Sequence, residues 1–570
     1  MRPNVASSLG VASTEGYLPD DPVPRKGCGI SVASLVVKDA RVYTGEPGAP
    51  WAEAIACAGE RIVRVGSDRQ IERLEGPATR VIAAEGRLVL PGFIDAHVHL
   101  IWGFEVGSWI DLTDRPSITE ATRRVAEYTR AHPDEEIVIG YGFDYASLLP
   151  HGLPSKEDLD EAVRERPVVL LAYDGHTGWG NTAFTERVLA FPGARGSGLG
   201  GMQRERATRR PTGIFLRVFD LFSVLPEIRR RRSLEGLKRT VSQASRHGIT
   251  TAFDIQVELE DLHAYDDLRR TGDLSVRTIA AIHHPRGTPH ERYREFAAAR
   301  DRYRGDWFSV EAVKLYIDGV VETGSAALLE PYATDPASRG TTEYEVEEYR
   351  GIVRTLSELG FQVCTHATGD RGARIALDAY EAVGKRAARS DARHRIEHCE
   401  VLAREDIPRF ASVGVVPCMM PQHASPEFTT RWREALGRER AGAAFPWRSL
   451  LSAGASVAFA SDWPVAPMDP LGGIHEAVAR ETQDGAPSPE RISVQEAIDG
   501  YTRRAAYACR AEATRGTLAP GKYADLLILS DDLFVVSPDR IPTVRVLTTM
   551  VGGRVAVSGD PRAPSSETAS

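Results

Sequence analysis

Two histidines near residue 100 are the first residues whose type and spacing could support chemistry. His97 and His99 lie two residues apart near the end of the apolar run Leu88–Leu100, so both project from the same face of a strand. Two imidazoles on one face can bind a metal ion, but a lone His-x-His pair is also compatible with hydrogen-bonded structural histidines. The rest of the chain decides between these two interpretations.

Three further ligand-type residues stand at or near the ends of later apolar runs. They are His366 after Phe361–Thr365, His398 within Arg395–Glu400, and Asp462 after Val457–Ser461. Four histidines and one aspartate that converge in space form a cluster suited to zinc or another first-row divalent ion. The pattern predicts a metal site, provided that the fold brings these positions together.

Eight short apolar β-rich runs supply the elements that would do so. They are separated by amphipathic helical segments, and strands that alternate with helices predict a parallel sheet in an α/β fold. Eight repeats favour a closed (β/α)8 TIM-like barrel, in which the carboxyl ends of the strands meet at one mouth. We assign this barrel to residues 91–515. The runs are Leu88–Leu100, Thr250–Ile255, Val276–Ile282, Val310–Ile317, Phe361–Thr365, Arg395–Glu400, Gly414–Met420 and Val457–Ser461.

The uneven spacing of the runs predicts an insertion in the barrel. The first run ends at Leu100 and the second begins at Thr250, which is far more chain than one helix needs. We place the insertion at residues 101–235. Because it follows the first strand, it would lie over the carboxyl ends of the strands, where such barrels carry their active sites. We interpret it as a lid or a substrate-binding subdomain.

The two ends of the chain predict a second, smaller domain. Residues 32–90 and 516–558 both consist of short β-rich runs separated by turns. Neither end has enough strands to bury an apolar face alone, so we expect the two to form one composite β-sandwich. Residues 1–31 and 559–570 are expected to be flexible tails.

The bulk composition limits the partners of the chain. Its 570 residues are 42% apolar and 26% charged, with a net charge of −9, and this mild acidity argues against nucleic-acid binding. No apolar run approaches the ~18 residues of a membrane span, the N-terminus lacks the apolar core of a secretory signal, and the six cysteines show no paired spacing. We expect a cytoplasmic protein with a small-molecule substrate and no nucleic-acid or membrane partner. The oligomeric state is left open, with a homodimer as one option.

Seven segments between residues 90 and 530 carry a more specific pattern. They are PGFIDAHVHL at 91–100, DGHTGWGN at 174–181, VKLYIDGVVETGSAALLEPY at 313–332, HATGDRG at 366–372, HRIEHCE at 394–400, ASDWPV at 460–465 and LAPGKYADLLIL at 518–529. Together they resemble the amidohydrolase superfamily, and specifically its family-three branch of YtcJ-like and N-substituted formamide deformylase-like proteins. The first segment alone identifies only the superfamily.

The resemblance implies a binuclear metal centre, with zinc as the expected metal. It assigns His97, His99 and Asp462 to one ion, and His366 and His398 to the other. The ions would lower the pKa of a bridging water and polarise the substrate carbonyl. Asp462 would take the proton of that water and pass it to the leaving amine.

The resemblance also gives Lys314 a role that spacing alone could not. This lysine lies in the run Val310–Ile317, and in two-metal relatives a lysine at this position is N6-carboxylated and bridges the ions. A neutral amine must form first, and burial beside cations lowers a lysine pKa. The alternative is an ordinary lysine paired with Asp318 or another carboxylate.

Three further residues are candidates for the site. The resemblance implies that His176, just after the run Val168–Tyr173, binds the substrate carbonyl or the developing oxyanion. Trp179 could line the substrate pocket, although core packing is an equal alternative. Asp370 is a candidate to orient a metal ligand through a hydrogen bond.

These assignments predict a hydrolase that cleaves the carbon–nitrogen bond of an amide or N-acyl compound by attack of a metal-bridging hydroxide. An N-formyl compound is one precedent in the family. A deaminase is the first alternative, but such enzymes commonly carry a glutamate three residues after the fifth-strand histidine, where this chain has Gly369. An ester, carbamate or lactam hydrolase would use the same ions. An inactive barrel scaffold is a remote alternative, because all six ligand positions are present.

Overall fold

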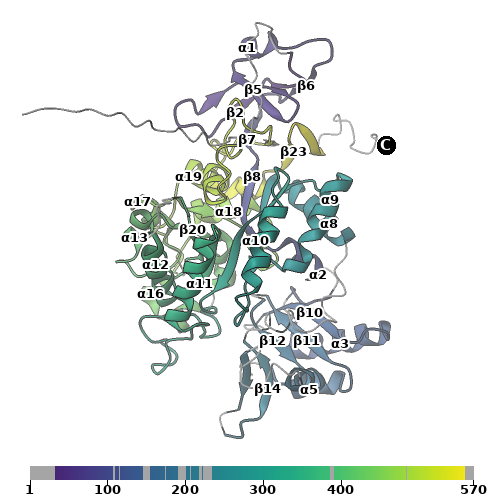
Figure 1. The fold of residues 1–570 in the computed structure, drawn as a ribbon, viewed down its shortest axis with the longest axis vertical. Helices are drawn as coiled ribbons and strands as arrows, with labels where there is room; N and C mark the ends of the chain where they lie inside the picture. The colour runs from purple at the N-terminus through teal and green to yellow at the C-terminus, as the bar shows by residue number, and fades with distance from the viewer. Residues whose placement is uncertain are drawn as a thin grey trace, which may run out of the picture.

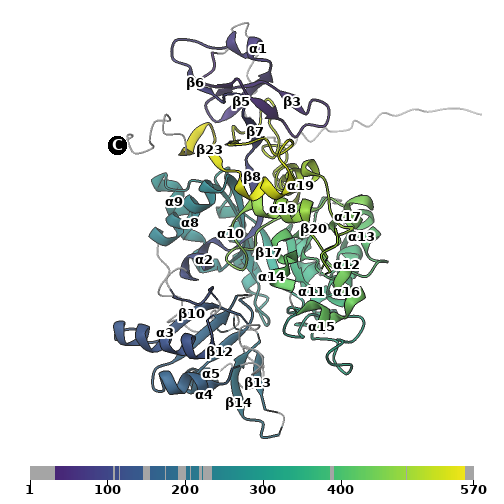
Figure 2. The same ribbon diagram turned by 180° about the vertical axis from the view of Figure 1, so that it is seen from behind.

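The computed structural model of the chain has three parts arranged along its longest axis. Figure 1 and Figure 2 show two small β-sheets at one end, a barrel surrounded by helices in the middle, and a mixed part of strands and helices at the other end. The tails expected at residues 1–31 and 559–570 lie outside the described residues. The structure describes residues 32–558 apart from 107–108, 115, 145–153, 174, 191–200, 206, 217, 219–220, 222–233, 385–390, 430 and 483.

Eight parallel strands form the central barrel, as the sequence predicts. Each strand pairs with the next one along the chain, and each overlaps one of the eight apolar runs. The α/β barrel is therefore confirmed. Its strands are β8 (Phe93–Val98), β15 (Ile249–Val257), β16 (Arg277–His283), β17 (Phe308–Tyr316), β18 (Gln362–Ala367), β19 (Arg395–His398), β20 (Val416–Met419) and β21 (Ala458–Phe459).

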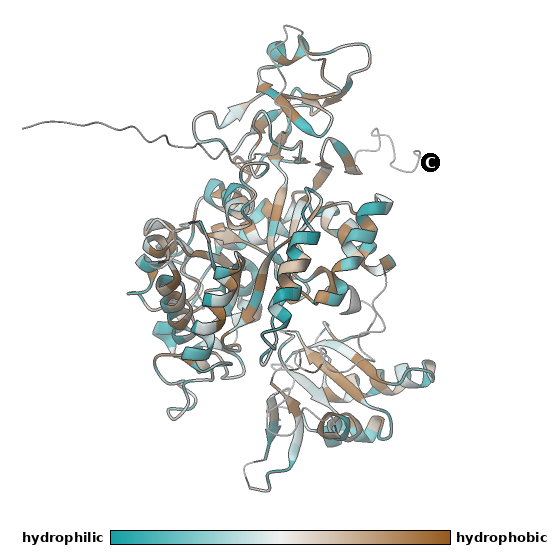
Figure 3. Cartoon of the chain, viewed as in Figure 1, coloured by the Kyte–Doolittle hydropathy of each residue, from teal (hydrophilic) through white to brown (hydrophobic). Residues whose placement is uncertain are grey.

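The barrel strands are apolar on both faces because both faces are covered. The sequence of β15, ITTAFDIQV, is rich in the β-branched and aromatic residues that favour extended chain. Ala281 and Cys364 pack in the barrel interior, whereas Ile282 and Val363 pack outward against the helices. Figure 3 shows the apolar strands in the middle of the molecule and a more polar surface on outer helices such as α10 (Arg292–Arg302).

Helices between the strands cover the outside of the barrel. Gly272 and Gly414 end two of them with left-handed φ angles of 79° and 76°, a conformation that glycine adopts without steric cost. The helices around the barrel include α2 (Leu100–Val106), α8 (Leu234–Arg246), α9 (Leu262–Thr271), α10, α11 (Val346–Glu358), α12 (Asp370–Gly384), α13 (Ile407–Val413), α14 (Pro426–Thr429), α15 (Trp432–Leu436), α16 (Arg438–Gly442), α17 (Trp447–Ser452), α18 (Pro470–Ala479), α19 (Val494–Gly500) and α20 (Arg503–Ala508).

Backbone hydrogen bonds close the barrel between its first strand and the segment after its last. The amide of Asp462 donates to the carbonyl of His97 at 2.8 Å, and the amide of His99 donates to the carbonyl of Trp463 at 2.9 Å. We call this pair of hydrogen bonds the barrel seam. It runs through residues that the sequence assigns to the metal site.

Strands from the two ends of the chain pair in one sheet. β7 is antiparallel to β22, and β22 continues into the hairpin of β23 and β24. A second sheet comes from the N-terminal segment alone. One apolar cluster contains residues of both sheets, including Val37, Val89 and Leu526. The strands are β1 (Leu35–Lys38), β2 (Arg41–Tyr43), β3 (Trp51–Ala52), β4 (Ala54–Ala58), β5 (Arg61–Gly66), β6 (Arg80–Ala83), β7 (Leu88–Pro91), β22 (Leu526–Leu529), β23 (Val546–Val551) and β24 (Arg554–Ser558).

Between β8 and β15 the chain builds a six-stranded sheet of its own, in the order β13-β14-β12-β11-β10-β9. Figure 1 shows it at the end of the barrel opposite the two small sheets. The hydroxyl of Tyr141 lies 2.6 Å from the carbonyl oxygen of Tyr173 and 2.9 Å from that of Pro464, so this part contacts the loop after β21. Its elements are β9 (Ile110–Asp111), α3 (Ile118–Ala131), β10 (Val138–Phe143), α4 (Lys156–Ala162), β11 (Val168–Ala172), β12 (Gly178–Gly180), α5 (Thr182–Ala190), β13 (Met202–Arg204) and β14 (Pro211–Phe215).

Two further observations concern the surface and the cysteines. Among the described residues, none of the helices combines the length and the apolar character that a membrane crossing requires. The five cysteines in the described part of the chain are all buried free thiols.

Candidate metal centre

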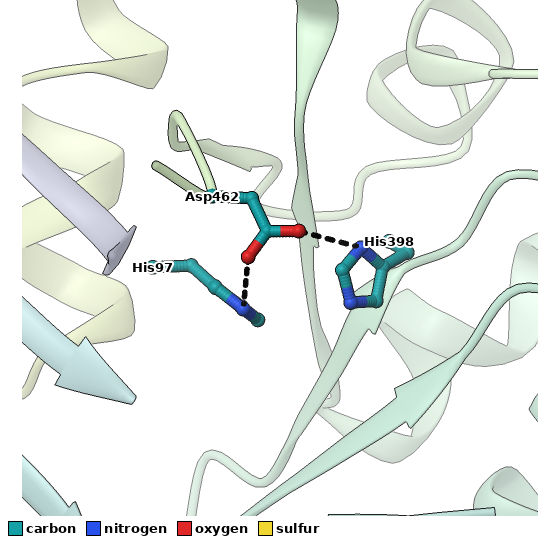
Figure 4. Close-up of side chains that lie close together, drawn as sticks. All are labelled: His97, His398 and Asp462. Atoms are coloured by element: carbon teal, nitrogen blue, oxygen red, sulfur yellow. Dashed lines mark ion pairs between the residues drawn. The ribbon is translucent and has the colours of Figure 1, made fainter. Parts of the chain in front are cut away.

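Asp462 stands at the centre of the predicted metal site. Its Oδ1 lies 3.1 Å from Nε2 of His97 and 3.1 Å from Nε2 of His99. Its Oδ2 lies 3.9 Å from Nδ1 of His398. Figure 4 shows the carboxylate between His97 and His398, with one oxygen directed at each ring. Strands that are far apart in the sequence thus bring predicted ligands together.

A buried carboxylate fixes the orientation of His97. Glu397 Oε2 lies 2.7 Å from Nδ1 of His97, and Arg395 donates a hydrogen bond of 2.8 Å to each oxygen of Glu397. Burial alone would raise the pKa of Glu397, but Arg395 and His97 outweigh this effect and lower the pKa to about 2. The ionised carboxylate accepts a hydrogen bond from the Nδ1–H group of His97. The lone pair of the ring is then on Nε2 and faces Asp462, as is typical of metal-binding histidines.

Replacing Glu397 by glutamine is expected to weaken metal binding by about 10–100-fold. Glutamine is a weaker acceptor for the Nδ1 proton of His97, and it also loses the ion pair with Arg395. The measurement is a titration of the metal-free variant with chelator-buffered zinc, with thermal melting as a check on folding. Glu258→Gln is the matched control, because Glu258 makes the same kind of contact with Nδ1 of His283, at 2.8 Å, and neither residue is assigned to the metal site. Equal affinity in Glu397→Gln and the unaltered chain would contradict this role.

His366 and His398 form the other side of the cluster. Their ring centroids are 4.4 Å apart, and burial lowers the pKa of each well below its ordinary value. His398 has a left-handed φ of 74° and Asp462 one of 59°, a backbone conformation that is uncommon outside glycine. Strained backbone of this kind clusters at functional positions.

Asp318 lies next to His366 and is held by backbone amides. It accepts hydrogen bonds from the amides of Ala327 and Gly369, each at 2.9 Å, and its Oδ1 lies 3.7 Å from Nε2 of His366. Burial raises the pKa of Asp318 to about 8. Asp318 therefore joins the loops that follow β17 and β18, and it makes no ion pair with Lys314 among the described residues.

Lys314 lies fully buried in the barrel interior. Among the described residues its Nζ has no hydrogen-bond partner, and it stands 4.8 Å from the ring centroid of Tyr316. Burial lowers the pKa of Lys314. A buried ammonium without a partner is costly, so this environment favours a neutral amine or a modified lysine over an ordinary ion-paired one.

The donor set at this place fits a divalent ion. His97, His398 and Asp462 offer ligand atoms within 4.8 Å of one another. Burial lowers the pKa of His99 to about 4, which keeps its ring neutral near pH 7, the state that binds metals. Buried polar atoms left without partners are costly, and a metal ion would satisfy several at once. Among the described residues they include His97 Nε2, His99 Nδ1, Lys314 Nζ, His366 Nδ1 and Asp462 Oδ1.

The sequence interpretation missed a second carboxylate–histidine pair. His423 lies in the short 3-10 helix η5 (Pro421–Ala424) after β20, with Nδ1 3.1 Å from Glu400 Oε1 and Nε2 3.7 Å from Asp462 Oδ2. Burial lowers the pKa of His423, but the hydrogen bond with Glu400 and the charge of Asp462 outweigh it and raise the pKa. Divalent ions would act in the opposite direction, since their charge favours the neutral ring. The available signal was a histidine just after the seventh apolar run.

The structure brings His176 from the inserted sheet to the cluster. Its ring centroid lies 4.9 Å from that of His366 and 5.8 Å from that of Tyr316. Burial is the main cause that lowers the pKa of His176 to about 4, so the ring is neutral near pH 7 and can donate one hydrogen bond and accept another. Its position is compatible with the predicted contact to a substrate carbonyl.

Two other candidates from the sequence are not brought to the cluster. Trp179 is fully buried in the apolar core of the inserted sheet, and its ring N–H donates to the carbonyl of Ser155 at 2.7 Å. Asp370 begins α12, and its carboxylate accepts from the amides of Leu329 and Arg371 at 2.8 and 2.9 Å. Trp179 thus packs in a core, and Asp370 fixes a loop rather than a ligand histidine.

A small cavity of about 40 Å³ opens beside the cluster. His176, His423 and Asp462 are among its lining residues, together with the rings of Tyr173 and Phe428. A second cavity of about 250 Å³ is lined partly by the same two rings. Since a cavity of about 10–15 Å³ already holds one water, the first cavity has room for a small reacting group and the second for a larger substituent.

Comparisons with known proteins add to this geometry. The model of the amidohydrolase family matches residues 80–557. Protein LONG AFTER FAR-RED 3 of Arabidopsis thaliana is 29% identical over 92% of this chain and 91% of its own length. An N-substituted formamide deformylase of Arthrobacter pascens is 27% identical over 91% of this chain and 97% of its own. A solved structure of an uncharacterized metal-dependent hydrolase from Pyrococcus horikoshii has a TM-score of 0.70 at 23% identity, covering 89% of this chain and 99% of its own.

Proposed function

The chain belongs to the amidohydrolase family and is a hydrolase, and on this premise we propose that it uses metal ions to cleave the carbon–nitrogen bond of a small amide or N-acyl compound. The observation that supports this most strongly is the convergence of His97, His99 and His398 on the two oxygens of Asp462. The small cavity beside them has room for a reacting carbonyl group.

Two divalent ions, with zinc as the expected metal, would be held by the clustered side chains. His97, His99 and Asp462 would hold one ion, and His366 and His398 the other. When bound, such ions lower the pKa of a water and polarise the substrate carbonyl. Burial lowers the pKa values of His99, His366 and His398, which favours this use of the site because protonated rings do not bind metals.

The position of Lys314 supports its carboxylation. Its buried Nζ lacks a hydrogen-bond partner among the described residues, and the lowered pKa favours the neutral amine that reacts with carbon dioxide. The resulting carbamate would carry negative charge into the barrel interior, where it could bridge two cations. An ion pair with Asp318 would have argued for an ordinary lysine.

Asp462 and His176 would act on the reacting group itself. Burial alone would raise the pKa of Asp462, but the neighbouring His97 and His99 lower it well below its ordinary value. The ionised carboxylate would take a proton from the attacking water and pass it to the leaving nitrogen. His176 would donate a hydrogen bond to the carbonyl oxygen as negative charge develops there.

The acyl group of the substrate is proposed to be small, with N-formyl compounds as the smallest candidates. The cavity at the cluster is only about 40 Å³, so a bulky acyl group would have to displace lining side chains. A deaminase receives less support. Gly369 stands where such enzymes carry a glutamate, and the neighbouring Asp370 is held by backbone amides.

The parts around the barrel are proposed to act as separate units. Residues 32–90 and 516–558 would form one composite β-sandwich domain, a view supported by the pairing of β7 with β22. Residues 101–235 would form a lid or substrate-binding subdomain on the barrel of residues 91–515. The approach of His176 to His366 supports this second assignment.

Metal analysis followed by a substrate screen tests the proposed function. The purified chain is expected to contain close to two divalent ions, as binuclear hydrolases do, and to hydrolyse at least one class among N-formyl, N-acyl and cyclic amides. Treatment with a chelator should lower the rate, and zinc, cobalt or manganese should restore it. Full activity of the metal-free protein would contradict the proposal.

A further inference from the structure

His423 has one ring nitrogen held in place and the other facing the small cavity. Its Nδ1 lies 3.1 Å from Glu400 Oε1, and the side chain stacks on Phe428 with ring centroids 5.4 Å apart and planes inclined by 22°. The residue is 8% exposed, and its Nε2 has no hydrogen-bond partner among the described residues. A histidine held so firmly has a defined direction for its free nitrogen.

The partner of Nδ1 decides what the free nitrogen can do. An ionised carboxylate only accepts hydrogen bonds, so Nδ1 of His423 carries a hydrogen and donates it in a hydrogen bond to Glu400. In the neutral ring Nε2 then has a lone pair and acts as an acceptor. His97 has the same arrangement, with Glu397 at its Nδ1. When divalent ions are bound, their charge favours the neutral ring, and His423 would then present an acceptor, fixed in direction by Glu400 and Phe428, to the cavity beside Asp462.

The position of this acceptor relates it to the leaving group of the substrate. Nε2 of His423 lies 3.7 Å from Asp462 Oδ2, the carboxylate that the proposed function assigns to protonating the leaving nitrogen. An atom that receives a proton from Asp462 therefore also lies near His423. We propose that Nε2 of His423 accepts the N–H of the scissile amide, so that the site selects amides bearing this hydrogen over esters and N,N-disubstituted amides. This inference rests on the proposed function.

The selectivity follows from what each substrate offers to the fixed acceptor. An N-monosubstituted amide donates its hydrogen to Nε2 and keeps the nitrogen lone pair for the proton from Asp462. An ester oxygen has no hydrogen, so it would leave the buried Nε2 unpaired and set lone pairs against it. A site built to bind an N–H group discriminates strongly against analogues that lack it, because its own polar atom is then left without a partner.

The test compares three compounds that share one acyl group: an N-monosubstituted amide, its N-methyl derivative, and the corresponding ester. The acyl group is the one found best in the screen, and kcat/KM is measured for the metal-loaded chain and for His423→Phe. In the variant the preference for the N–H amide over the ester is expected to fall by about 10–100-fold, as for loss of one buried hydrogen bond. Phenylalanine retains the ring that stacks on Phe428.

Two further variants separate this role from a merely structural one. Glu400→Gln keeps an oxygen that accepts the Nδ1 proton, so it should retain most of the preference, whereas Glu400→Leu should lose it. His283→Phe is the matched control, because His283 also pairs with a carboxylate at the end of a barrel strand but is not among the residues that line the cavity. The preference of His283→Phe for the N–H amide over the ester should equal that of the natural chain. Metal content and melting temperature are recorded for every variant.

The possible outcomes distinguish this inference from the proposed function. Equal losses on all three compounds in His423→Phe, or loss of metal in that variant, would overturn the role of His423 and leave metal-dependent hydrolysis in place. A natural chain that hydrolyses the ester but neither amide would overturn both the role of His423 and the proposed cleavage of carbon–nitrogen bonds, and would leave only metal-dependent hydrolysis in place. Failure of the metal-loaded natural chain to hydrolyse any member of the screen would overturn the proposed function itself.

Discussion

Replacing Asp462 by asparagine is expected to lower kcat by about 10²–10⁴-fold, the usual effect of losing general acid–base catalysis. Asparagine retains one oxygen close to Nε2 of His97 and His99, where Asp462 Oδ1 now lies at 3.1 Å from each, so much of the metal should stay bound. It cannot take a proton from water or pass one to the leaving nitrogen. The measurement pairs kcat with metal content on the same protein sample.

The comparison needs a control that changes an aspartate to asparagine elsewhere. Asp370→Asn is suitable, because its carboxylate is buried but binds the backbone amides of Leu329 and Arg371. Its kcat is expected to change by much less than that of Asp462→Asn. Near-normal turnover of Asp462→Asn with its metal in place would show that another group moves the proton.

Replacing Lys314 by alanine is expected to remove at least one metal ion and most of the activity. Two dications about 3.5–4 Å apart repel strongly in a pocket of low dielectric, and a carbamate would offset part of that repulsion. An unmodified ammonium would add a third positive charge. The expectation is tested by the metal content and activity of Lys314→Ala. The intact mass of the natural chain is measured as well, since carboxylation adds mass at one lysine.

Two other substitutions at the same position separate charge from packing. Lys314→Met retains a side chain of similar length without the amine, so it should lose metal and activity as alanine does. Lys314→Glu should retain more of both, because its carboxylate can replace the carbamate at shorter reach, and short carboxylic acids should partly restore Lys314→Ala. An unmodified lysine in a chain with two bound ions would rule out the bridging role.

The barrel and the approximate place of the site could be predicted because parallel barrels leave a simple pattern in the sequence. Strands buried on both faces form continuous apolar runs, and the runs ending near His366, His398 and Asp462 are strands in the structure. Since the carboxyl ends of such strands meet at one mouth, ligand-type residues there become neighbours without any knowledge of their side-chain contacts.

The direction of individual side chains could not be predicted in the same way. Ile396 packs outward against the helices, and strict alternation would place His398 on the same outer face. The left-handed φ of His398 instead turns its ring toward the cluster, 5.1 Å from that of His97. Sequence alternation contains no sign of such a local break in the strand.

Side-chain contacts between residues far apart in the sequence could not be predicted either. The hydrogen bonds from His97 to Glu397 and from His423 to Glu400 depend on the register between neighbouring strands and on loop paths, which periodicity does not encode. Trp179 shows the converse problem. It pairs with Leu170 in the middle of the inserted sheet, so a motif that suggests a pocket residue contains a core residue instead.

The barrel seam links the completeness of the fold to the completeness of the metal site. The amide of Asp462 donates to the carbonyl of His97, and the amide of His99 donates to the carbonyl of Trp463, so the residues proposed to hold the first ion meet only when the last strand reaches the first. A nascent chain that stops before residue 462 has no full set of ligands. Under the proposed ligand assignment, metal uptake would belong to the final stage of folding, and ions that bind only the closed form would stabilise it against reopening. A chain that holds the first ion would then be one whose barrel has closed.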